Sequence, residues 1–180
     1  MRIIHTSDWH LGQNFYSKSR AAEHDAFLHW LLTTAETEKV DAIIVAGDIF
    51  DTGSPPSYAR ELYNRFVVNL QQTGCHLVVL AGNHDSVATL NESRDILSFL
   101  NTTVIASAGH QPFILNQRDG TPGAVFCPVP FLRPRDIITS QAGLSGSEKQ
   151  RQVLESITDY YQQQYLQACA LRANRPLPII

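Results

Sequence analysis

Three short apolar runs, separated by helical patterns, constrain the fold of this chain more than any other feature. The runs cover residues 2–6, 41–46 and 76–81. The second and third runs are continuous rather than alternating, which is typical of strands buried on both faces of a sheet. Between the runs, residues 22–37 and 57–72 carry apolar side chains at helical spacing, with Ser57 as a candidate cap and Gly74 as a candidate stop. This order predicts an α/β fold with a parallel sheet.

The chain after the third run follows a different pattern. A further helix is expected over residues 91–100. Short strands are expected at residues 104–106, 112–115 and 124–129, with a turn at 116–120. Because Gly, Asn, Asp and Pro separate these strands, we expect a second, more antiparallel sheet.

The last part of the chain predicts a loop, a long helix and the start of another strand. The loop is expected over residues 133–146 and the helix from about residue 147 to residue 172. Residues 175–180 begin an apolar strand, and the chain stops there. We therefore expect residues 1–180 to be the N-terminal part of a domain that is incomplete at its C-terminus.

Size and composition indicate one globular domain without a membrane segment. A chain of 180 residues can bury a substantial core. The net charge of -3 provides no overall attraction to nucleic acid, so a polyanion would be held by local basic loops and bound metal. Cys75, Cys127 and Cys169 form no CxxC pair, which favours reduced thiols in a cytoplasmic protein. No apolar run approaches the ~20 residues that cross a bilayer.

Polar motifs follow each of the three apolar runs. These motifs are Asp8-x-His10, Gly47-Asp48 and Gly82-Asn83-His84-Asp85. Ligands of open α/β sheets bind at the carboxyl ends of the strands, so these side chains are expected to converge. Carboxylate, imidazole and amide ligands without thiolate suit two divalent ions ~3.5–4 Å apart, with manganese, magnesium or iron favoured over structural zinc. Asp8 and His10 are the expected ligands of one ion, Asn83 of the other, and Asp48 is the candidate bridge.

His84 and Asp85 are the candidate catalytic residues. His84 follows the ligand Asn83 and is expected to face the substrate rather than the same ion. Its predicted role is to donate a proton or a hydrogen bond to the leaving oxygen or to a phosphate oxygen. Asp85 is expected to fix the tautomer and orientation of the His84 ring, as carboxylates do for ligand histidines.

Several other residues have both a structural and a functional interpretation. His5 is expected to be a buried histidine of the first strand, and His24 and His29 to be solvated or at an interface. Trp9 either forms a wall of the site or packs in the core. Lys18, Arg20 and the basic residues within 131–135 are either contacts to a DNA backbone or solvated surface charge.

The three motifs together resemble those of the calcineurin-like metallophosphoesterase superfamily. Its motifs run D-x-H, G-D and G-N-H-D/E, and residues 5–12 (HTSDWHLG) resemble the branch of DNA double-strand-break repair nucleases. The resemblance implies a layered sandwich with parallel or mixed central sheets flanked by helices. It also implies a manganese-dependent phosphodiesterase that cuts DNA, forms homodimers and works with an ATP-hydrolysing coiled-coil partner. In this interpretation Asp8, His10, Asp48 and Asn83 are metal ligands and His84 is the catalytic histidine.

The chain departs from the superfamily pattern after its first half. The superfamily continues with a further strand-end histidine and a Gly-His-x-His motif, neither of which occurs here. The single later histidine, His110, lies in Ala-Gly-His-Gln and lacks the second histidine. About half of the resembled site is therefore expected in this chain. Two alternatives stay open: another calcineurin-like phosphatase or cyclic-nucleotide phosphodiesterase, and a non-catalytic dimerisation or partner module.

Overall fold

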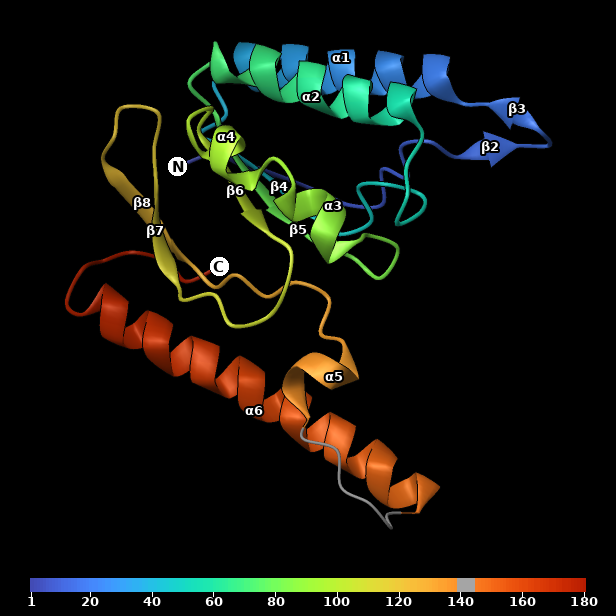
Figure 1. Ribbon diagram of the computed structural model, residues 1–180. Helices are drawn as coiled ribbons and strands as arrows, with labels where there is room; N and C mark the ends of the chain where they lie inside the picture. The colour runs from blue at the N-terminus through green and yellow to red at the C-terminus, as the bar shows by residue number, and fades with distance from the viewer. Residues whose placement is uncertain (139–144) are drawn as a thin grey trace.

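A four-stranded parallel sheet forms the centre of the molecule. The computed structural model describes residues 1–138 and 145–180. The strands are β1 (Ile3–Thr6), β4 (Ala42–Ala46), β5 (His76–Leu80) and β6 (Thr102–Ile105). They lie in the order β1-β4-β5-β6, and each neighbouring pair is parallel (Figure 1). The predicted α/β fold with a parallel central sheet is confirmed.

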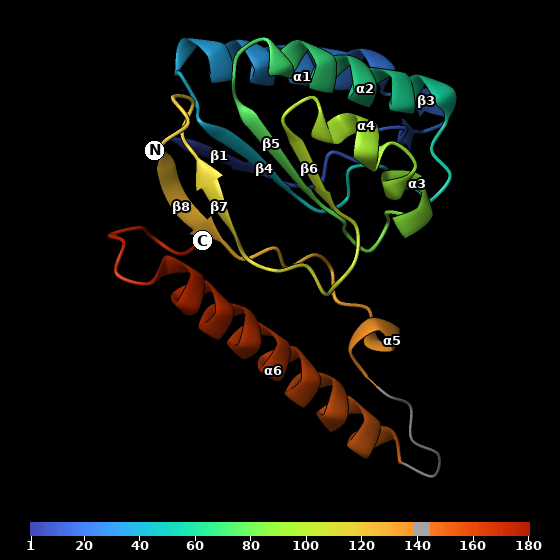
Figure 2. The ribbon, with the colours of Figure 1, turned by 60° about the vertical axis from the view of Figure 1, so that its left-hand side comes forward.

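Two long helices cover one face of this sheet. They are α1 (Ala21–Thr37) and α2 (Ser57–Gln71), which lie side by side in both views (Figure 2). Successive side chains of a strand point to opposite faces, so Val45 and Val79 join the cluster beneath the helices while Ile44 and Val78 join a second cluster on the other face. Burial on both faces explains why these runs are continuously apolar.

A β-hairpin covers the other face. Its strands are β7 (Phe113–Asn116) and β8 (Pro122–Phe126), which pair antiparallel as a separate two-stranded sheet. Leu115 and Phe126 from this hairpin pack with Ile44 and Val78 of the central sheet. The expected antiparallel hairpin is therefore confirmed, and it closes the second face of the parallel sheet rather than extending it.

The C-terminal part runs beside the hairpin. Helix α6 (Gly146–Arg172) lies next to β8, and of its 27 residues Gln164 and Ala168 are buried (Figure 2). Beyond the helix, the chain pairs in parallel with β8 at the bridge between Ile179 and Val125. Within the described part of the chain, no helix combines the length and the apolar character needed to cross a membrane.

Some predicted elements differ from the structure. The helix expected over residues 91–100 is replaced by two short helices, α3 (Val87–Asn91) and α4 (Arg94–Ser98). Ser93, with φ -112° and ψ 7°, leaves the helical conformation between them. The strand expected at residues 104–106 begins earlier, at Thr102, and belongs to the parallel sheet as β6. The polar Asn101, Thr102 and Thr103 were interpreted as the end of the preceding helix, whereas both threonines pair with β5, which agrees with the strand propensity of β-branched residues.

Two small elements carry no recognisable signal in the sequence. Strands β2 (Asn14–Phe15) and β3 (Lys18–Ser19) form a hairpin whose turn residues both have positive φ. Two-residue strands are too short to show a periodicity. The loop expected at residues 133–146 contains the short helix α5 (Pro134–Ile137), and its residues 139–144 lie outside the described ranges.

Four expectations about single residues are settled by the structure. His5 is exposed rather than buried, because β1 lies at an edge of the central sheet. His24 is buried on α1, whereas a solvated or interface position was expected. Ser57 begins α2 without capping it, since Pro56 occupies the cap position. Trp9 packs in the core, edge-to-face with aromatic rings of α1 and α2.

Candidate metal centre

Tight turns after β1 and β4 bring the first two motifs together. Asp8 and Asp48 both adopt positive φ, 55° and 50°, a conformation that is uncommon for residues other than glycine and that Asp adopts more readily than most. The backbone N–H of Asp8 donates to the Gly47 carbonyl at 3.1 Å, and that of His10 donates to the Asp48 carbonyl at 3.0 Å. The segments that follow β1 and β4 thus remain paired beyond the end of the sheet, and their polar side chains are neighbours.

Asp8, His10 and Asp48 form a compact group of potential metal ligands. His10 Nε2 lies 3.8 Å from Asp8 Oδ1 and 3.9 Å from Asp48 Oδ2. One ligand atom of each residue lies within 4.8 Å of the others. Two carboxylates and one imidazole, converging without a thiolate, fit a divalent ion such as manganese, magnesium or iron. The donor set of this chain therefore suits the metal that the family motifs imply.

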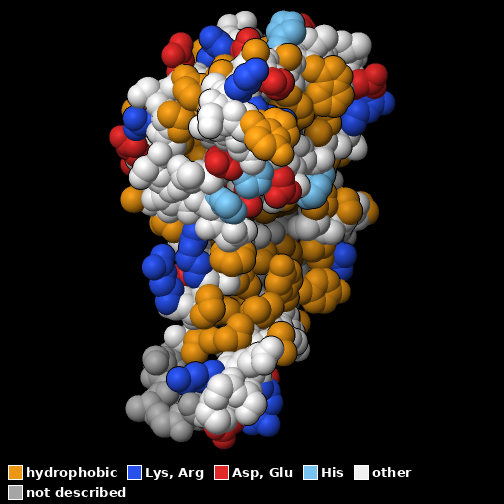
Figure 3. All heavy atoms as spheres, turned by 90° about the vertical axis from the view of Figure 1, so that its right-hand side faces the viewer, with side chains coloured by type: hydrophobic (Ala, Val, Ile, Leu, Met, Phe, Trp, Pro, Cys, Tyr) orange, Lys and Arg blue, Asp and Glu red, His pale blue; other side chains and the backbone are white. Residues whose placement is uncertain are grey.

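Asn83 lies beside the same group. Asp8, Asp48 and Asn83 line one hollow, whose volume is about 300 Å³. The opposite wall of the hollow is largely apolar and is contributed by the segment after β8 and by α6; it consists of Val129, Pro130, Phe131 and Tyr161. Figure 3 shows histidine and acidic side chains gathered on one face of the molecule, above a broad band of apolar side chains. The structure thus brings the predicted amide ligand to the predicted carboxylates.

His84 is held at the edge of this group by two hydrogen bonds. Its backbone N–H donates to Asp48 Oδ1 at 3.0 Å, and its Nδ1 lies 2.8 Å from the backbone carbonyl of Asp51. Because a carbonyl only accepts, Nδ1 must carry the proton in this contact, and Nε2 is left for another partner. This hydrogen bond, followed by the charges of Asp48, Asp51 and Asp85, raises the pKa of the exposed His84 ring above its ordinary value.

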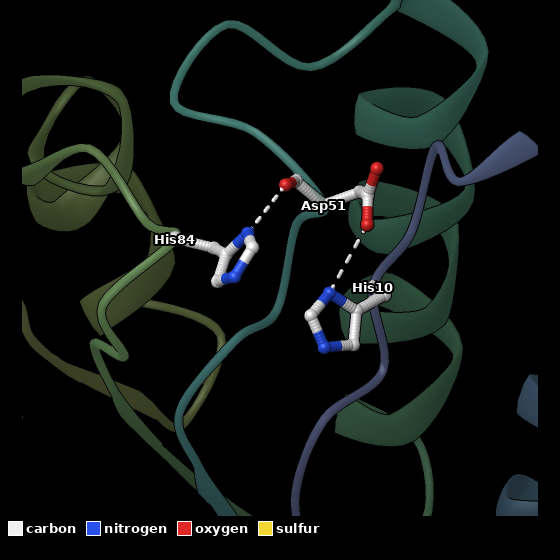
Figure 4. A group of neighbouring side chains, drawn as sticks. All are labelled: His10, Asp51 and His84. Atoms are coloured by element: carbon white, nitrogen blue, oxygen red, sulfur yellow. Dashed lines mark hydrogen bonds and ion pairs between the residues drawn. The ribbon is translucent and has the colours of Figure 1, made fainter.

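Asp51 links the two histidines of the site. Its Oδ1 lies 3.2 Å from His10 Nδ1, while its carbonyl contacts His84 (Figure 4). The two imidazole rings stand edge-to-face with centroids 5.0 Å apart. No role for Asp51 was predicted, although an acidic residue three positions after Asp48 is itself a signal in the sequence.

The carboxylate of Asp85 has a different role from the one expected. It is buried and accepts backbone N–H groups from Gly82 at 2.8 Å, Phe50 at 3.0 Å and Ile49 at 3.2 Å. Burial raises the pKa of Asp85, and these three N–H groups oppose that shift. The partner of the His84 ring is Asp51, so Asp85 is corrected from a partner of His84 to a residue that ties two turns together.

Arg133 also has a role in the site that was not predicted, because its charge was interpreted only as surface charge or as a contact to DNA. Its Nη2 donates to the carbonyls of Asp85, at 2.7 Å, and Gly82, at 3.2 Å. Arg20 similarly points inward, donating to Gln13 Oε1 at 2.7 Å, whereas Lys18 is exposed. No local pattern predicts such contacts, because Arg133 is 48 residues from the nearer carbonyl in the chain.

Comparison with known proteins agrees with this geometry. The model of the calcineurin-like phosphoesterase family matches residues 1–167. The SbcD subunit of nuclease SbcCD from Escherichia coli (strain K12) is 82% identical over all 180 residues of this chain, which cover 45% of that relative. The protein of the same name in Rhodobacter capsulatus is 35% identical over 148 residues, which are 76% of this chain and 36% of the relative.

A third relative, the SbcD subunit of nuclease SbcCD from Bacillus subtilis (strain 168), matches a shorter region. It is 45% identical over 87 residues, which are 48% of this chain and 22% of that protein. The chain therefore spans less than half the length of the curated relatives it matches. The resemblance that the motifs indicate is confirmed at the level of the family.

Proposed function

Because this chain belongs to the calcineurin-like phosphoesterase family, we propose that it forms part of a metal-dependent nuclease that hydrolyses phosphodiester bonds of DNA. The observation that carries the proposal is the convergence of Asp8, His10 and Asp48 within 4.8 Å, with Asn83 lining the same hollow. The similarity to nuclease subunits supports DNA over a small phosphate ester as the substrate.

The residues of the site divide into ligands and a proton donor. Asp8 and His10 would hold one divalent ion, Asn83 would hold the other, and Asp48 would contribute to both. When bound, two Mn²⁺ ions, with Mg²⁺ and Fe²⁺ as alternatives, would supply charge neutralisation of the phosphate and a water of lowered pKa. The buried position of Asp48 suits a shared ligand, because its carboxylate is already held in place by the backbone N–H of His84.

His84 is the residue that we assign to the leaving oxygen. Its Nδ1 donates to the Asp51 carbonyl, so its Nε2 faces outward. In the neutral ring Nε2 accepts a hydrogen bond, and in the protonated ring it donates a proton or a hydrogen bond toward a substrate. The ring is exposed, and it stands next to the ligand His10. Asp51 therefore orients the ring, and Asp85 and Arg133 hold the loop that carries it.

The names of the relatives suggest the wider assembly. They are SbcD subunits of a nuclease called SbcCD. We propose that the protein containing this chain acts on DNA ends and hairpins as an exonuclease and endonuclease, together with an SbcC-like ATPase subunit and as a homodimer. Its expected place is the cytoplasm, in DNA repair, recombination and replication.

The test compares cleavage with metal binding in the full-length protein. With Mn²⁺ and a DNA hairpin as substrate, His84→Gln is expected to lower the cleavage rate by about 10²–10⁴-fold, the contribution of a general acid. Its calorimetric titration with Mn²⁺ should stay close to that of the unmodified protein, because His84 is not assigned as a ligand. His29→Gln, on the exposed face of α1, is the matched control and should change neither measurement.

Two results would favour the alternatives. Hydrolysis of p-nitrophenyl phosphate, or of its bis ester, without any cleavage of DNA would favour a phosphatase or a cyclic-nucleotide phosphodiesterase. A full-length protein that does not bind Mn²⁺ at all would favour a non-catalytic partner module. Titration of the 180-residue chain by itself would show how much of the site these residues form alone.

A further inference from the structure

The loop that carries Asn83 and His84 is held from two sides by side chains of opposite charge. On one side the Asp85 carboxylate accepts the N–H groups of Gly82, Ile49 and Phe50. These bonds tie the loop to the turn after β4. On the other side Arg133 donates to the carbonyls of Gly82 and Asp85, the first and last residues of the loop. Both ends of the loop are thus fixed, and the two residues between them project toward the site.

Arg133 reaches the loop because its own segment is anchored to the central sheet. The N–H of Phe131 donates to the Ala81 carbonyl at 2.8 Å, directly after β5. The guanidinium Cζ lies 5.8 Å from the centre of the Phe131 ring. Val129, Pro130 and Phe131 of the same segment line the hollow that contains Asn83. The segment therefore forms a wall of the site and carries the arginine that holds the opposite loop.

The partial burial of the Arg133 guanidinium indicates that its bonds to the loop matter. Its Nη1 is buried and has no hydrogen-bond partner among the residues that the structure describes. A partly buried charged group loses solvation, and the two carbonyl contacts of Nη2 replace part of it. Solvated surface charge would show neither the burial nor the contacts.

We propose that Arg133 is a positioning residue for the metal ligand Asn83, an inference that rests on the function proposed above. Asn83 is one residue from the Gly82 carbonyl and two from the Asp85 carbonyl, the two groups that Arg133 binds. Without the guanidinium both carbonyls lose their charged donor, and the loop relaxes around Asp85 alone. The Asn83 amide then moves away from the position beside Asp8 and Asp48, and the ion that it holds binds more weakly.

The experiment measures Mn²⁺ binding to the full-length protein by calorimetry and electron paramagnetic resonance. Asn83→Ala first identifies which binding step depends on Asn83. Arg133→Gln is expected to weaken that same step by about 10–100-fold, the usual effect of losing a partner that orients a ligand, and to spare the other step. Arg133→Lys, which keeps one charged nitrogen, should restore part of the affinity. Arg135→Gln, at an exposed arginine two residues away, is the matched control and should bind as the unmodified protein does.

Unchanged binding of both ions by Arg133→Gln would overturn the inference, as would an equal weakening of both steps. If Arg133→Gln does not fold, Arg133→Lys is used for the test. Weaker Mn²⁺ binding in the Asn83-dependent step alone would support the inference. Unchanged binding, or equal weakening of both steps, would contradict it.

Hydrogen exchange separates this inference from the proposed function. In metal-free protein the amides of Gly82 and His84, which donate to Asp85 and Asp48, should exchange faster in Arg133→Gln than in Arg135→Gln. If the unmodified protein binds fewer than two ions or cuts no DNA, the proposed function fails, and the exchange result still decides the role of Arg133. Unchanged protection of both amides would then refute it.

Discussion

The two faces of the central sheet are covered in different ways. On one face, α1 and α2 lie over an extended cluster of buried side chains that continues into the turns bearing Asp8 and Asp48. On the other face, a hairpin covers a much smaller cluster, and α6 contributes Gln164 and Ala168 as its buried residues. Since buried apolar contacts set local stability, the helical face is expected to be the rigid part of the molecule.

This difference bears on the site, because its two walls come from the two regions. The turns after β1, β4 and β5, which carry the proposed metal ligands, belong to the rigid part. The apolar wall, which includes Phe131 and Tyr161, belongs to the region after β8. Ligands must be held closely in place, whereas a wall tolerates movement. Arg133 and Phe131 matter here because they fasten the second region to the first.

The largest expected effect tests whether the two regions differ in stability. Leu77, 1% exposed on β5, packs beneath the helices, and Leu77→Ala is expected to cost about 2–5 kcal/mol of unfolding free energy through lost burial and a cavity. Leu166→Ala, at a residue of α6 that is 57% exposed, should change it by less than about 0.5 kcal/mol. Urea unfolding measures both, and similar costs would contradict the comparison.

A glycine in the rigid part tests how closely the ligands are held. A Cβ added at Gly82 would overlap the carboxylate and the backbone N of Asp48. Gly82→Ala should therefore displace Asp48 and weaken Mn²⁺ binding by about 10–100-fold, or about 1.4–2.7 kcal/mol. Gly146→Ala, where an added Cβ meets nothing within 4 Å, is the control for calorimetric titration. Normal metal binding by Gly82→Ala would show that the turn after β5 moves to make room for the added Cβ without displacing Asp48.

The cap of α6 tests whether this helix unfolds independently. Ser145 and Glu148 form a reciprocal capping box, with Ser145 Oγ accepting from the Glu148 N–H and Glu148 Oε2 accepting from the Ser145 N–H. Ser145→Ala is expected to cost the helix about 1 kcal/mol. Hydrogen exchange should quicken in α6 while the amides of β4 and β5 keep their protection. Equal acceleration in all three elements would mean that the two regions unfold together.

The smallest expected effect concerns acid stability. Burial lowers the pKa of His76, whose Nε2 lies 2.9 Å from Thr103 Oγ1 between two strands of the sheet. A histidine with a lowered folded pKa contributes stability that is present above its ordinary pKa of about 6.5 and is lost as pH falls below it. His76→Gln should therefore reduce the loss of unfolding free energy between about pH 7 and pH 5.

The control for this pH series is His29→Gln, which replaces an exposed histidine of α1 and should leave the slope unchanged. Burial also lowers the pKa values of His24 and His110, so His76→Gln should reduce the slope and not abolish it. A slope identical to that of the unmodified protein would place the acid sensitivity outside the central sheet.

The prediction of the fold was strongest where a pattern repeats over many residues. The parallel sheet and its helical cover were predicted from the apolar runs at residues 41–46 and 76–81 and from the apolar stripes of α1 and α2. A strand that is buried on both faces has apolar residues at consecutive positions, which makes it recognisable. The predictions for Thr102 and His5 were wrong because no repeating pattern determines their environment. It depends on which strand lies next to them, and local composition does not predict the order of strands in a sheet.

For the candidate site, the sequence by itself determined which donor atoms are available and that they follow successive strands. Asp8, His10, Asp48 and Asn83 were recognisable because parallel strands end at one edge. Only the tertiary structure decided the supporting residues: the carbonyl of Asp51 on His84, the carboxylate of Asp85 on three N–H groups, and Arg133 on the loop. Ligand type is a property of single residues, whereas orientation comes from partners far away in the chain, which only folding brings within hydrogen-bond distance.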